Sequence, residues 1–344
     1  MPARELKRYL NKIANREDLS AIEIETLLDL LMSGVASPVQ MGAFLMGLRT
    51  KGETIQEITG AAKLLRARMT TVETPAGAVD IVGTGGDSHG TYNVSTCAAL
   101  VAAGAGVTIA KHGNRSVSSL SGASDVLQAL GVKLDVQPVT VARALTTAGI
   151  GFLWAPMHHP AMKIWAPIRA ELGLRTVFNL LGPLCNPGQV TRQVLGVYDR
   201  ALVQPIATVL QNLGSVHAWV VHGSDGMDEL TTTGLSYVAE LKSGVIRTFE
   251  VTPEAAGLPR ARLEDLKGGD ATLNATKLRA LLLGETGPYR DIVLLNSAAA
   301  LIVAGKASDL SQGVALAAQS IDSGAATLAL DKLVAITNED FVPG

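Results

Sequence analysis

The sequence predicts an α/β protein in which a small N-terminal helical domain precedes a large α/β domain with a mostly parallel central sheet. Two observations support this fold class. Residues 1 to about 70 carry several helix-start signals and no strand signal, whereas beyond them short apolar runs alternate with helical segments. We therefore expect a helical domain over 1–70 and an α/β domain over 75–344, with residues 70–77 as a hinge or linker.

Capping residues predict the helices of the N-terminal region. Three capping boxes, in which a hydroxyl residue is followed three places later by Glu or Gln, pair Ser20 with Glu23, Ser37 with Gln40 and Thr54 with Glu57. Pro38 suits the first position of a helix. Gly34 and Gly52 are predicted to end the first two of these helices, and a further helix is expected over 4–14.

Short apolar runs predict the strands of the large domain. They lie at 78–82, 106–110, 150–154, 193–199 and 217–222, with later β segments near 236–241 and 245–250. The segments 159–174 and 292–334 are predicted to be helical, and the second, rich in alanine, is expected to close the sheet. Ligands of such sheets bind at the carboxyl ends of the strands, so the residues that follow the strands are the candidates for a site.

Length and composition exclude several classes of protein. The chain has 344 residues, a formal net charge of -2 and two cysteines, Cys97 and Cys185, without metal-ligand spacing. The charge argues against a general nucleic-acid surface and against a polybasic membrane anchor. The first residues are charged and helical rather than a signal sequence, and the apolar runs are too short to span a bilayer. We expect a cytoplasmic protein with free thiols that binds neither nucleic acid nor membrane.

The stretch DIVGTGGDSHGTYNVST, residues 80–96, is the first candidate binding site. A strand leads into Gly83, Gly85 and Gly86, and a turn this rich in glycine adopts positive φ and lets an anion approach the backbone. Asn93 then leads into a helix of small apolar residues whose first N–H groups would face the same ligand. The stretch lacks the third glycine of the dinucleotide fingerprint and the ending of a nucleotide-hydrolase P-loop. Spacing alone therefore leaves a phosphate site and a turn without a ligand equally open.

A second loop, KHGNRSVSSLSGASD over 111–125, favours phosphate. It follows the apolar run 106–110 and sets two cations, Lys111 and Arg115, among hydroxyl residues ahead of a helix. Cations, hydroxyls and glycines at consecutive strand ends are typical of a site for a highly phosphorylated small molecule.

These two blocks, with HPAMKIWAPIRAELGLRTVFNLLGPLCNP over 159–187 and DGMDEL over 225–230, resemble the anthranilate phosphoribosyltransferases. The blocks stand in that family's order over nearly the whole chain. GTGGD is shared with pyrimidine nucleoside phosphorylases, whereas KHGNR and RTVFNLLGPLCNP point to the transferases. The resemblance implies the nucleoside phosphorylase/phosphoribosyltransferase type of fold. It also implies that helices around 159–190 join the N-terminal helical domain, and that the chain forms a homodimer through its N-terminal helices.

The activity that the resemblance implies is transfer of the phosphoribosyl group of phosphoribosyl pyrophosphate to anthranilate, in tryptophan biosynthesis. Because the arylamine is neutral at pH 7, positioning and electrostatics suffice, and we assign no residue as a catalytic acid or base. The positions that the resemblance assigns to the phosphoribosyl pyrophosphate site are Gly83, Gly86, Asp87, Thr91, Asn93, Val94, Ser95, Thr96, Lys111, His112, Gly113, Asn114, Arg115, Ser116, Val117, Ser118, Ser119 and Ala123.

Departure of pyrophosphate calls for Mg²⁺, a hard cation that uses a few oxygens and keeps several waters. The resemblance implies two ions, with Ser95 contributing to one and Asp228 and Glu229 serving the other. Without the resemblance, the acidic pair would be interpreted as a solvated turn. Two carboxylates facing a phosphate loop would repel the substrate, which favours the metal role.

For anthranilate, the resemblance implies Gly83, Asn114 and Arg169, with Arg169 pairing with the carboxylate. An arginine on a helix surface is the alternative for Arg169. His112 and Pro183 are expected near the aromatic ring, although a single histidine in a loop is more often structural.

The chain departs from the family pattern at few positions. Leu120 stands where the family usually has lysine and Ala123 where it has a hydroxyl residue, which weakens the expected phosphate contact at Ala123. Tyr92 replaces the commoner phenylalanine.

Two alternatives stay open on the sequence. A pyrimidine nucleoside phosphorylase would share GTGGD, would transfer deoxyribose to phosphate and would need no Mg²⁺. A transferase-like protein that binds nucleic acid would show a basic groove and altered anthranilate positions, and the slight negative charge and intact Arg169 argue against it.

Overall fold

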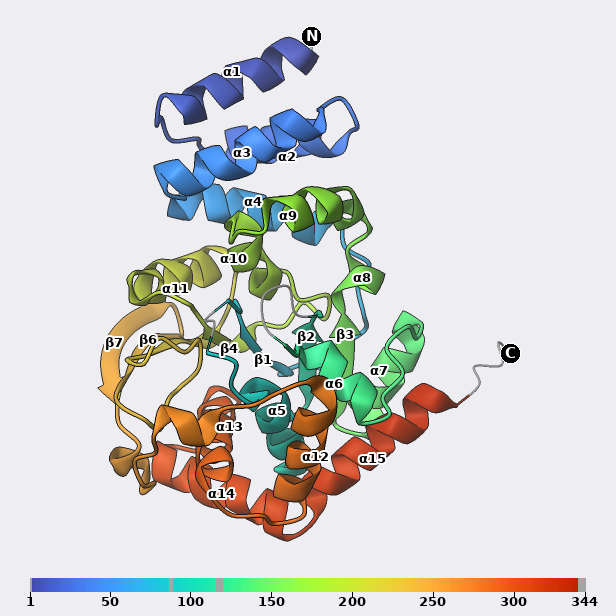
Figure 1. The fold of residues 1–344 in the computed structure, drawn as a ribbon, viewed down its shortest axis with the longest axis vertical. Helices are drawn as coiled ribbons and strands as arrows, with labels where there is room; N and C mark the ends of the chain where they lie inside the picture. The colour runs from blue at the N-terminus through green and yellow to red at the C-terminus, as the bar shows by residue number, and fades with distance from the viewer. Residues whose placement is uncertain (1, 87–88, 116–119, 340–344) are drawn as a thin grey trace.

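The computed structural model describes residues 2–86, 89–115 and 120–339. Its N-terminal part consists of four helices, α1 (Pro2–Ala14), α2 (Ala21–Met32), α3 (Pro38–Lys51) and α4 (Ile55–Ala67). They lie together at one end of the long axis of the molecule (Figure 1). All three predicted capping boxes form: the N-cap hydroxyl accepts the N3 backbone N–H, and the N3 side chain accepts the N–H of the N-cap residue.

The large domain contains a seven-stranded sheet in the order β3-β2-β1-β4-β5-β6-β7. The strands are β1 (Val79–Gly83), β2 (Ile109–Gly113), β3 (Ile150–Trp154), β4 (Arg192–Gly196), β5 (His217–Gly223), β6 (Ser236–Lys242) and β7 (Val245–Val251). The first five are parallel, whereas β6 and β7 are antiparallel to their neighbours. The predicted α/β class with a mostly parallel sheet is confirmed.

Helices cover both faces of this sheet (Figure 1). In chain order they are α5 (Val94–Gly104), α6 (Ala123–Ala129), α7 (Pro138–Thr147), α8 (Ala155–His158), α9 (Ala166–Leu172), α10 (Val177–Leu184), α11 (Val203–Asn212), α12 (Ala271–Leu282), α13 (Pro288–Val303), α14 (Leu310–Asp322) and α15 (Ala325–Asn338). Short 3-10 helices occupy Pro160–Trp165, Arg200–Leu202, Glu254–Ala256 and Leu263–Leu266. No helix of the described ranges is both long enough and apolar enough to cross a membrane.

The alternation of side chains along the strands divides the interior into two main cores. In β5, Trp219 and Val221 face the core built with α5, α13 and α15, whereas Ala218 and Val220 face the core built with α10 and α11. The second core continues without a break into α1–α4, where Phe44 packs on Trp165 of the 159–174 segment. The helical end of the molecule is therefore packed against one face of the sheet through shared apolar side chains.

Several predicted boundaries differ from those observed. The second strand is Ile109–Gly113 instead of 106–110, so Lys111 and His112 belong to β2 and not to the loop that follows it. The predicted helix 159–174 is a 3-10 turn followed by α9, because Pro160 and Pro167 interrupt a continuous α-helix. The helical region predicted over 292–334 is three helices, α13 to α15, beginning at Pro288.

Candidate active site

A pocket of about 450 Å³ is lined by residues at the ends of β1 and β2 and by residues of α9 and α10. The predicted residues that line it are Gly83, Gly86, Thr91, Asn93, Val94, Ser95, Lys111, His112, Gly113, Asn114, Arg115, Ala123, Arg169, Pro183, Asp228 and Glu229. Thr96 does not line the pocket. Successive residues of a helix point about 100° apart, so Thr96 points away from the direction of Ser95, and its side chain is buried. Asp87, Ser116, Val117, Ser118 and Ser119 lie outside the described residues.

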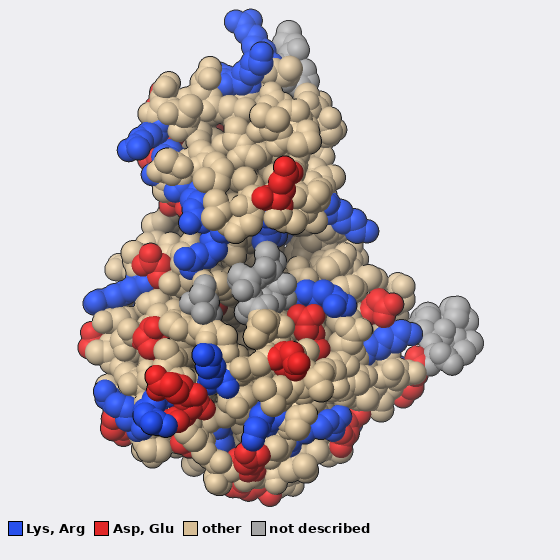
Figure 2. Space-filling model, viewed as in Figure 1, with Lys and Arg blue, Asp and Glu red and all other residues tan. Residues whose placement is uncertain are grey.

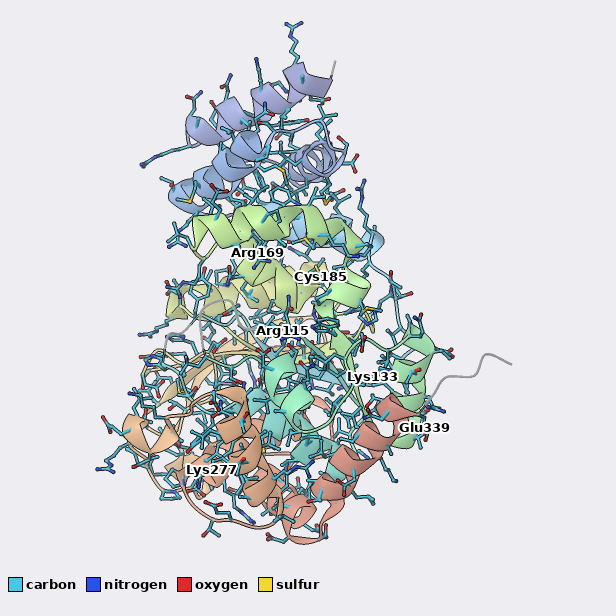
Figure 3. The ribbon with its side chains drawn as sticks, turned by 45° about the vertical axis from the view of Figure 1, so that its right-hand side comes forward. Arg115, Lys133, Arg169, Cys185, Lys277 and Glu339 are labelled. Atoms are coloured by element: carbon cyan, nitrogen blue, oxygen red, sulfur yellow. The ribbon has the colours of Figure 1, made fainter. Side chains whose placement is uncertain are left out.

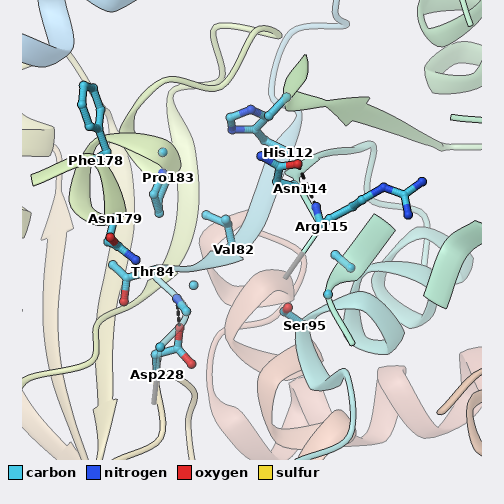
Figure 4. A pocket seen from close by; sticks show the side chains of 18 of the residues that line it. Val82, Thr84, Ser95, His112, Asn114, Arg115, Phe178, Asn179, Pro183 and Asp228 are labelled. Atoms are coloured by element: carbon cyan, nitrogen blue, oxygen red, sulfur yellow. Dashed lines mark hydrogen bonds between the residues drawn. The ribbon is translucent and has the colours of Figure 1, made fainter. Parts of the chain in front are cut away.

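The acidic pair meets the glycine turn across the bottom of the pocket (Figure 4). The Gly85 N–H donates to Asp228 Oδ2 at 2.6 Å, and the Ser95 N–H, in the first turn of α5, donates to Glu229 Oε1 at 3.2 Å. A Cβ at Gly196 would collide with the backbone of Asp228, so the absence of a side chain there lets the acidic turn approach β4. Residues about 140 positions apart in the sequence are thus fixed against each other.

Lys111 lies under the pocket as a buried cation, which corrects its expected place in a loop. Its side chain is only 2% exposed; its Nζ donates to the Ile81 carbonyl at 2.6 Å and to Ser95 Oγ at 3.4 Å. Burial lowers the pKa of the ammonium group, and the charges of Asp80, Glu229 and Asp228 oppose that shift. Lys111 therefore acts on Ser95 and the acidic pair from behind the turn.

Asp80 of β1 ties the 159–187 block to the base of the pocket. Its buried carboxylate accepts the His112 N–H at 3.1 Å and the Asn186 amide at 2.8 Å. Asn186 also donates to the Ala110 carbonyl at 2.8 Å. Burial raises the pKa of Asp80 to about 6, against the opposing charge of Lys111. These contacts join β1, β2 and residues 185–187, the end of the 159–187 block, in one hydrogen-bond network.

His112 faces the pocket from β2 and contacts a second histidine. Its Nε2 lies 3.2 Å from Nε2 of His159, so one ring donates to the other. Burial lowers the pKa of His112 well below its ordinary value and that of His159 to about 4. Both rings are consequently neutral at pH 7, and the pair presents no charge to an aromatic ligand.

The second loop contributes Asn114 and Arg115, which lie on the same side of the pocket as His112 (Figure 4). Asn114 Oδ1 accepts the Arg115 N–H at 2.8 Å. The Arg115 side chain is 56% exposed and reaches Asp125 at 3.4 Å and Gln128 at 3.1 Å on α6. Its positive charge is therefore held at the rim by a weak surface pair.

Arg169 of α9 lies across the pocket from Arg115 (Figure 3). Its guanidinium lies 5.4 Å from the ring centroid of Phe178, and burial lowers the pKa of the guanidinium. Within the described part of the chain, no carboxylate lies within ion-pair distance of this group. A partly buried arginine of this kind is chemically suited to bind a ligand carboxylate.

Arg175, which the sequence analysis did not single out, joins the helical end to the glycine turn. Its Nη1 donates to the Gly86 carbonyl at 3.0 Å, its guanidinium lies over the ring of Tyr198 at 4.4 Å, and its own carbonyl accepts from Arg49 on α3. Further lining residues not predicted individually are Thr84, Tyr92, Ser121, Lys163, Phe178 and Asn179. All six lie within three of the sequence blocks, 80–96, 111–125 and 159–187, and their place in these blocks is the signal that could have indicated them.

The charges around the pocket have both signs. Figure 2 shows Lys and Arg side chains where the narrow helical end meets the broader α/β part, with acidic side chains just below. This distribution suits a ligand that carries phosphate groups and is bound together with cations.

The donor set fits Mg²⁺. The carboxylates of Asp228 and Glu229 and the Ser95 hydroxyl are hard oxygen donors on one wall. Among residues 2–86, 89–115 and 120–339 no group of three or more His, Cys, Asp or Glu could enclose an ion. Such a partial set is usual for Mg²⁺, which keeps waters and takes substrate phosphate oxygens as ligands.

Family models and solved structures agree with this geometry. Residues 7–69 match the helical bundle domain, and residues 75–327 the a/b domain, of a glycosyl transferase family. The fold and the site thus define a glycosyltransferase with a helical domain and an α/β domain. Anthranilate phosphoribosyltransferases of Rhodopseudomonas palustris and Parvibaculum lavamentivorans are each 60% identical, over 97% of this chain and 98% of each relative. The chain belongs to the anthranilate phosphoribosyltransferase family.

Two solved structures extend the comparison. The anthranilate phosphoribosyltransferase of Thermus thermophilus matches with a TM-score of 0.90 and 44% identity, over 96% of this chain and 99% of that one. That of Saccharomyces cerevisiae, in complex with PRPP and Mg, matches with a TM-score of 0.88 and 30% identity, over 96% and 97%. The predicted family, fold class and transferase activity are confirmed, and they are favoured over nucleoside phosphorolysis and nucleic-acid binding.

Proposed function

We propose that phosphoribosyl pyrophosphate lies along the glycine turn and the start of α5, and that anthranilate binds between it and α9. The observation that carries this arrangement is Arg169, a partly buried guanidinium that lines the same pocket as the glycine turn and the acidic pair. The Arg169 guanidinium would bind the anthranilate carboxylate, and the neutral His112 would face the aromatic ring. This placement sets the amine toward the ribose.

The phosphate end is assigned to backbone and hydroxyl donors. Gly85 and Gly86 have positive φ and line the pocket beside the first turn of α5, where a phosphate can approach the backbone closely. Lys111 orients Ser95 from below, and Asp228 and Glu229 would hold Mg²⁺ beside Ser95 on the same wall. When bound, the metal supplies charge neutralisation of the departing pyrophosphate. The side chains themselves bind and orient the substrates, and they exclude water from the pocket.

Ligands named for the yeast relative support these assignments. Its structures are described as complexes with PRPP and Mg and with 4-fluoroanthranilate. Two ions, rather than one, stay a prediction for this chain, as do the individual residue roles.

The direct test is a fluorescence assay for N-(5-phosphoribosyl)anthranilate with the purified chain. We expect product only when phosphoribosyl pyrophosphate, anthranilate and Mg²⁺ are all present, because pyrophosphate departs poorly without a cation. Removal of Mg²⁺ with a chelator should reduce the rate by at least about 100-fold, roughly the effect of losing one transition-state charge contact. Cleavage of pyrimidine nucleosides by phosphate, without use of phosphoribosyl pyrophosphate, would overturn the proposal.

We also propose that the chain is a homodimer joined through its N-terminal helices. Ile22 on α2 and Val39 on α3 are 76% and 80% exposed, which gives this end an apolar surface suited to a second copy. Light scattering should give the mass of two chains, and the mass of one would contradict the proposal. A cytoplasmic location, consistent with the two buried free thiols, stays a prediction for cell fractionation to check.

A further inference from the structure

We propose that Asn274, on α12 and outside the pocket, is a positioning residue that fixes the amide of Asn93 and thereby holds the two substrate loops together. This role rests on the phosphoribosyl pyrophosphate site proposed above. It adds a residue that no sequence motif indicated and that touches neither proposed substrate.

The first observation is a backbone pairing behind the glycine turn. The Tyr92 N–H donates to the Leu266 carbonyl at 3.0 Å, and the Gly268 N–H donates to the Gly90 carbonyl at 2.9 Å. Between them Thr91 and Lys267 form an antiparallel bridge. Residues 90–92 are therefore held by a short strand-like segment, 266–268, that belongs to another part of the chain.

The approach of this segment requires a glycine. A Cβ at Gly268 would lie 2.8 Å from the Thr91 carbonyl oxygen and 2.8 Å from Asn274 Oδ1, closer than a carbon normally comes to either atom. The segment leads into α12, whose N-cap is Asp270 and which packs beside α6 (Figure 1). Asn274, in the first turn of α12, is thus brought to the back of the glycine turn.

The second observation is that the orientation of the Asn274 amide is determined by its surroundings. Asn274 is 2% exposed, and the Gly269 N–H, which can only donate, lies 2.8 Å from its Oδ1. Its Nδ2 must then face the other way, where it donates to Asn93 Oδ1 at 2.9 Å. The backbone of the 266–269 segment therefore fixes which atom of Asn93 faces α12.

The third observation is that Asn93 passes this orientation on to the second loop. With Oδ1 turned to Asn274, its Nδ2 faces the Ser121 carbonyl, which can only accept, at 3.3 Å. Ser121 Oγ also lies 3.5 Å from Asn93 Oδ1. Asn93 and Ser121 both line the pocket, whereas Asn274 does not. One buried amide outside the site thus sets how the two loops of the phosphate side meet.

Loss of Asn274 should affect the binding of only one substrate, phosphoribosyl pyrophosphate. Asn93 and Ser121 lie on the phosphate side of the pocket, and Arg169 lies on the opposite wall. Loss of Asn274 would leave the Asn93 amide free to rotate and would relax the spacing of the loops. A defect in binding phosphoribosyl pyrophosphate is expected, with little change for anthranilate.

Two variants separate positioning from a general packing role. In Asn274→Ala, the Michaelis constant for phosphoribosyl pyrophosphate should rise about tenfold, the equivalent of ~1.4 kcal/mol, while that for anthranilate stays within about twofold. Asn274→Asp keeps an oxygen for the Gly269 N–H but sets its second oxygen against Asn93 Oδ1. It should therefore be at least as impaired as the alanine variant, whereas a residue that only capped the Gly269 N–H would be rescued by aspartate.

Ser320→Ala is the matched control. Ser320 is 3% exposed and donates to the Val101 carbonyl of α5 at 2.7 Å, away from the pocket lining. Its loss should lower the melting temperature without changing either Michaelis constant. The double variant Asn93→Ala with Asn274→Ala should be no worse than Asn93→Ala alone, because the second acts through the first.

Three results would overturn the role of Asn274: a parallel rise of both Michaelis constants, wild-type kinetics in Asn274→Asp, or additive effects in the double variant. The failure of the proposed function would look different. In that case the wild-type chain and Ser320→Ala would themselves show no Mg²⁺-dependent binding of phosphoribosyl pyrophosphate in calorimetry, and the role of Asn274 would fall with the site.

Discussion

Replacing Asp228 with Asn and Glu229 with Gln is expected to lower turnover by about 1,000-fold, the upper range for loss of one electrostatic contact to a transition state. It should also raise the Mg²⁺ concentration needed for half-maximal rate. The two carboxylates are the hard, negatively charged donors on the pocket wall. An amide of the same shape removes the charge that, in the proposed site, would hold the cation beside the glycine turn.

The fold should survive this change. In the structure, Asp228 accepts from the Gly85 N–H and Glu229 from the Ser95 N–H, and an amide oxygen can accept the same bonds. The double variant should therefore still fold, but it should melt below the wild type because the buried Lys111 loses two of the three carboxylates that offset its burial. Calorimetric titration of phosphoribosyl pyrophosphate at several Mg²⁺ concentrations measures the metal linkage independently of turnover.

A control from the same turn tests whether the effect is specific to the metal role. Asp225 accepts from the hydroxyls of Thr231 and Thr233, each at 2.6 Å, and does not line the pocket. Asp225→Asn should lower the melting temperature because a charged acceptor of three hydrogen bonds is lost, but it should leave the Mg²⁺ dependence unchanged. Unchanged rates of the Asp228 and Glu229 variant at limiting Mg²⁺ would refute the metal role.

The parts of the fold that depend on local chemistry could be predicted from the sequence. A capping box is complete within four residues, so Ser20, Ser37 and Thr54 mark helix starts without reference to the rest of the chain. The glycine turn and the acidic pair were also visible, because each forms a short block. Their meeting at one pocket follows from the parallel sheet, which brings successive strand ends to the same edge.

The sequence-based predictions are wrong where contacts between residues far apart in the sequence determine the structure. Lys111 was predicted as a loop cation because a charged side chain rarely lies inside a sheet. Its burial is made possible by three carboxylates, Asp80, Asp228 and Glu229, the last two more than 100 positions away. That compensation has no local signature, so the end of β2 was placed three residues too early.

The supporting contacts could not be found in the sequence for the same reason. Arg175 meets Gly86 across 89 positions, and Asn274 meets Asn93 across 181. A single polar residue on a helix surface has no periodic pattern, and only the fold shows which partner it reaches. The residues that position a site are thus harder to predict than those that form its walls.

Replacing Arg169 with alanine is expected to raise the Michaelis constant for anthranilate by about 10- to 100-fold, the range for loss of a hydrogen-bonded charge. The Michaelis constant for phosphoribosyl pyrophosphate should change by less than about twofold, because no hydrogen bond to that substrate is lost. Arg169 stands on α9, and the phosphate-side residues stand across the pocket on the sheet edge. Arg169→Lys should give a Michaelis constant for anthranilate between those of the wild type and Arg169→Ala. Lysine keeps the positive charge but loses the paired N–H donors of the guanidinium.

Arg200→Ala supplies the matched control. The Arg200 guanidinium lies 3.7 Å from the ring centroid of Tyr237, so this arginine shares the cation–π contact of Arg169 but lies outside the pocket lining. Its removal should alter neither Michaelis constant. An equal rise of the Michaelis constants for both substrates in Arg169→Ala would instead indicate that Arg169 holds α9 against Phe178.

The substrate itself offers the sharper comparison. Aniline has the amine of anthranilate without its carboxylate, so the wild-type chain already lacks the ion pair when aniline is the acceptor. Arg169→Ala should therefore cost little further rate with aniline, although it costs about 10- to 100-fold with anthranilate. The two changes, one in the protein and one in the ligand, should fail to add because both remove the same contact. Additive losses would show that the Arg169 guanidinium and the anthranilate carboxylate do not meet.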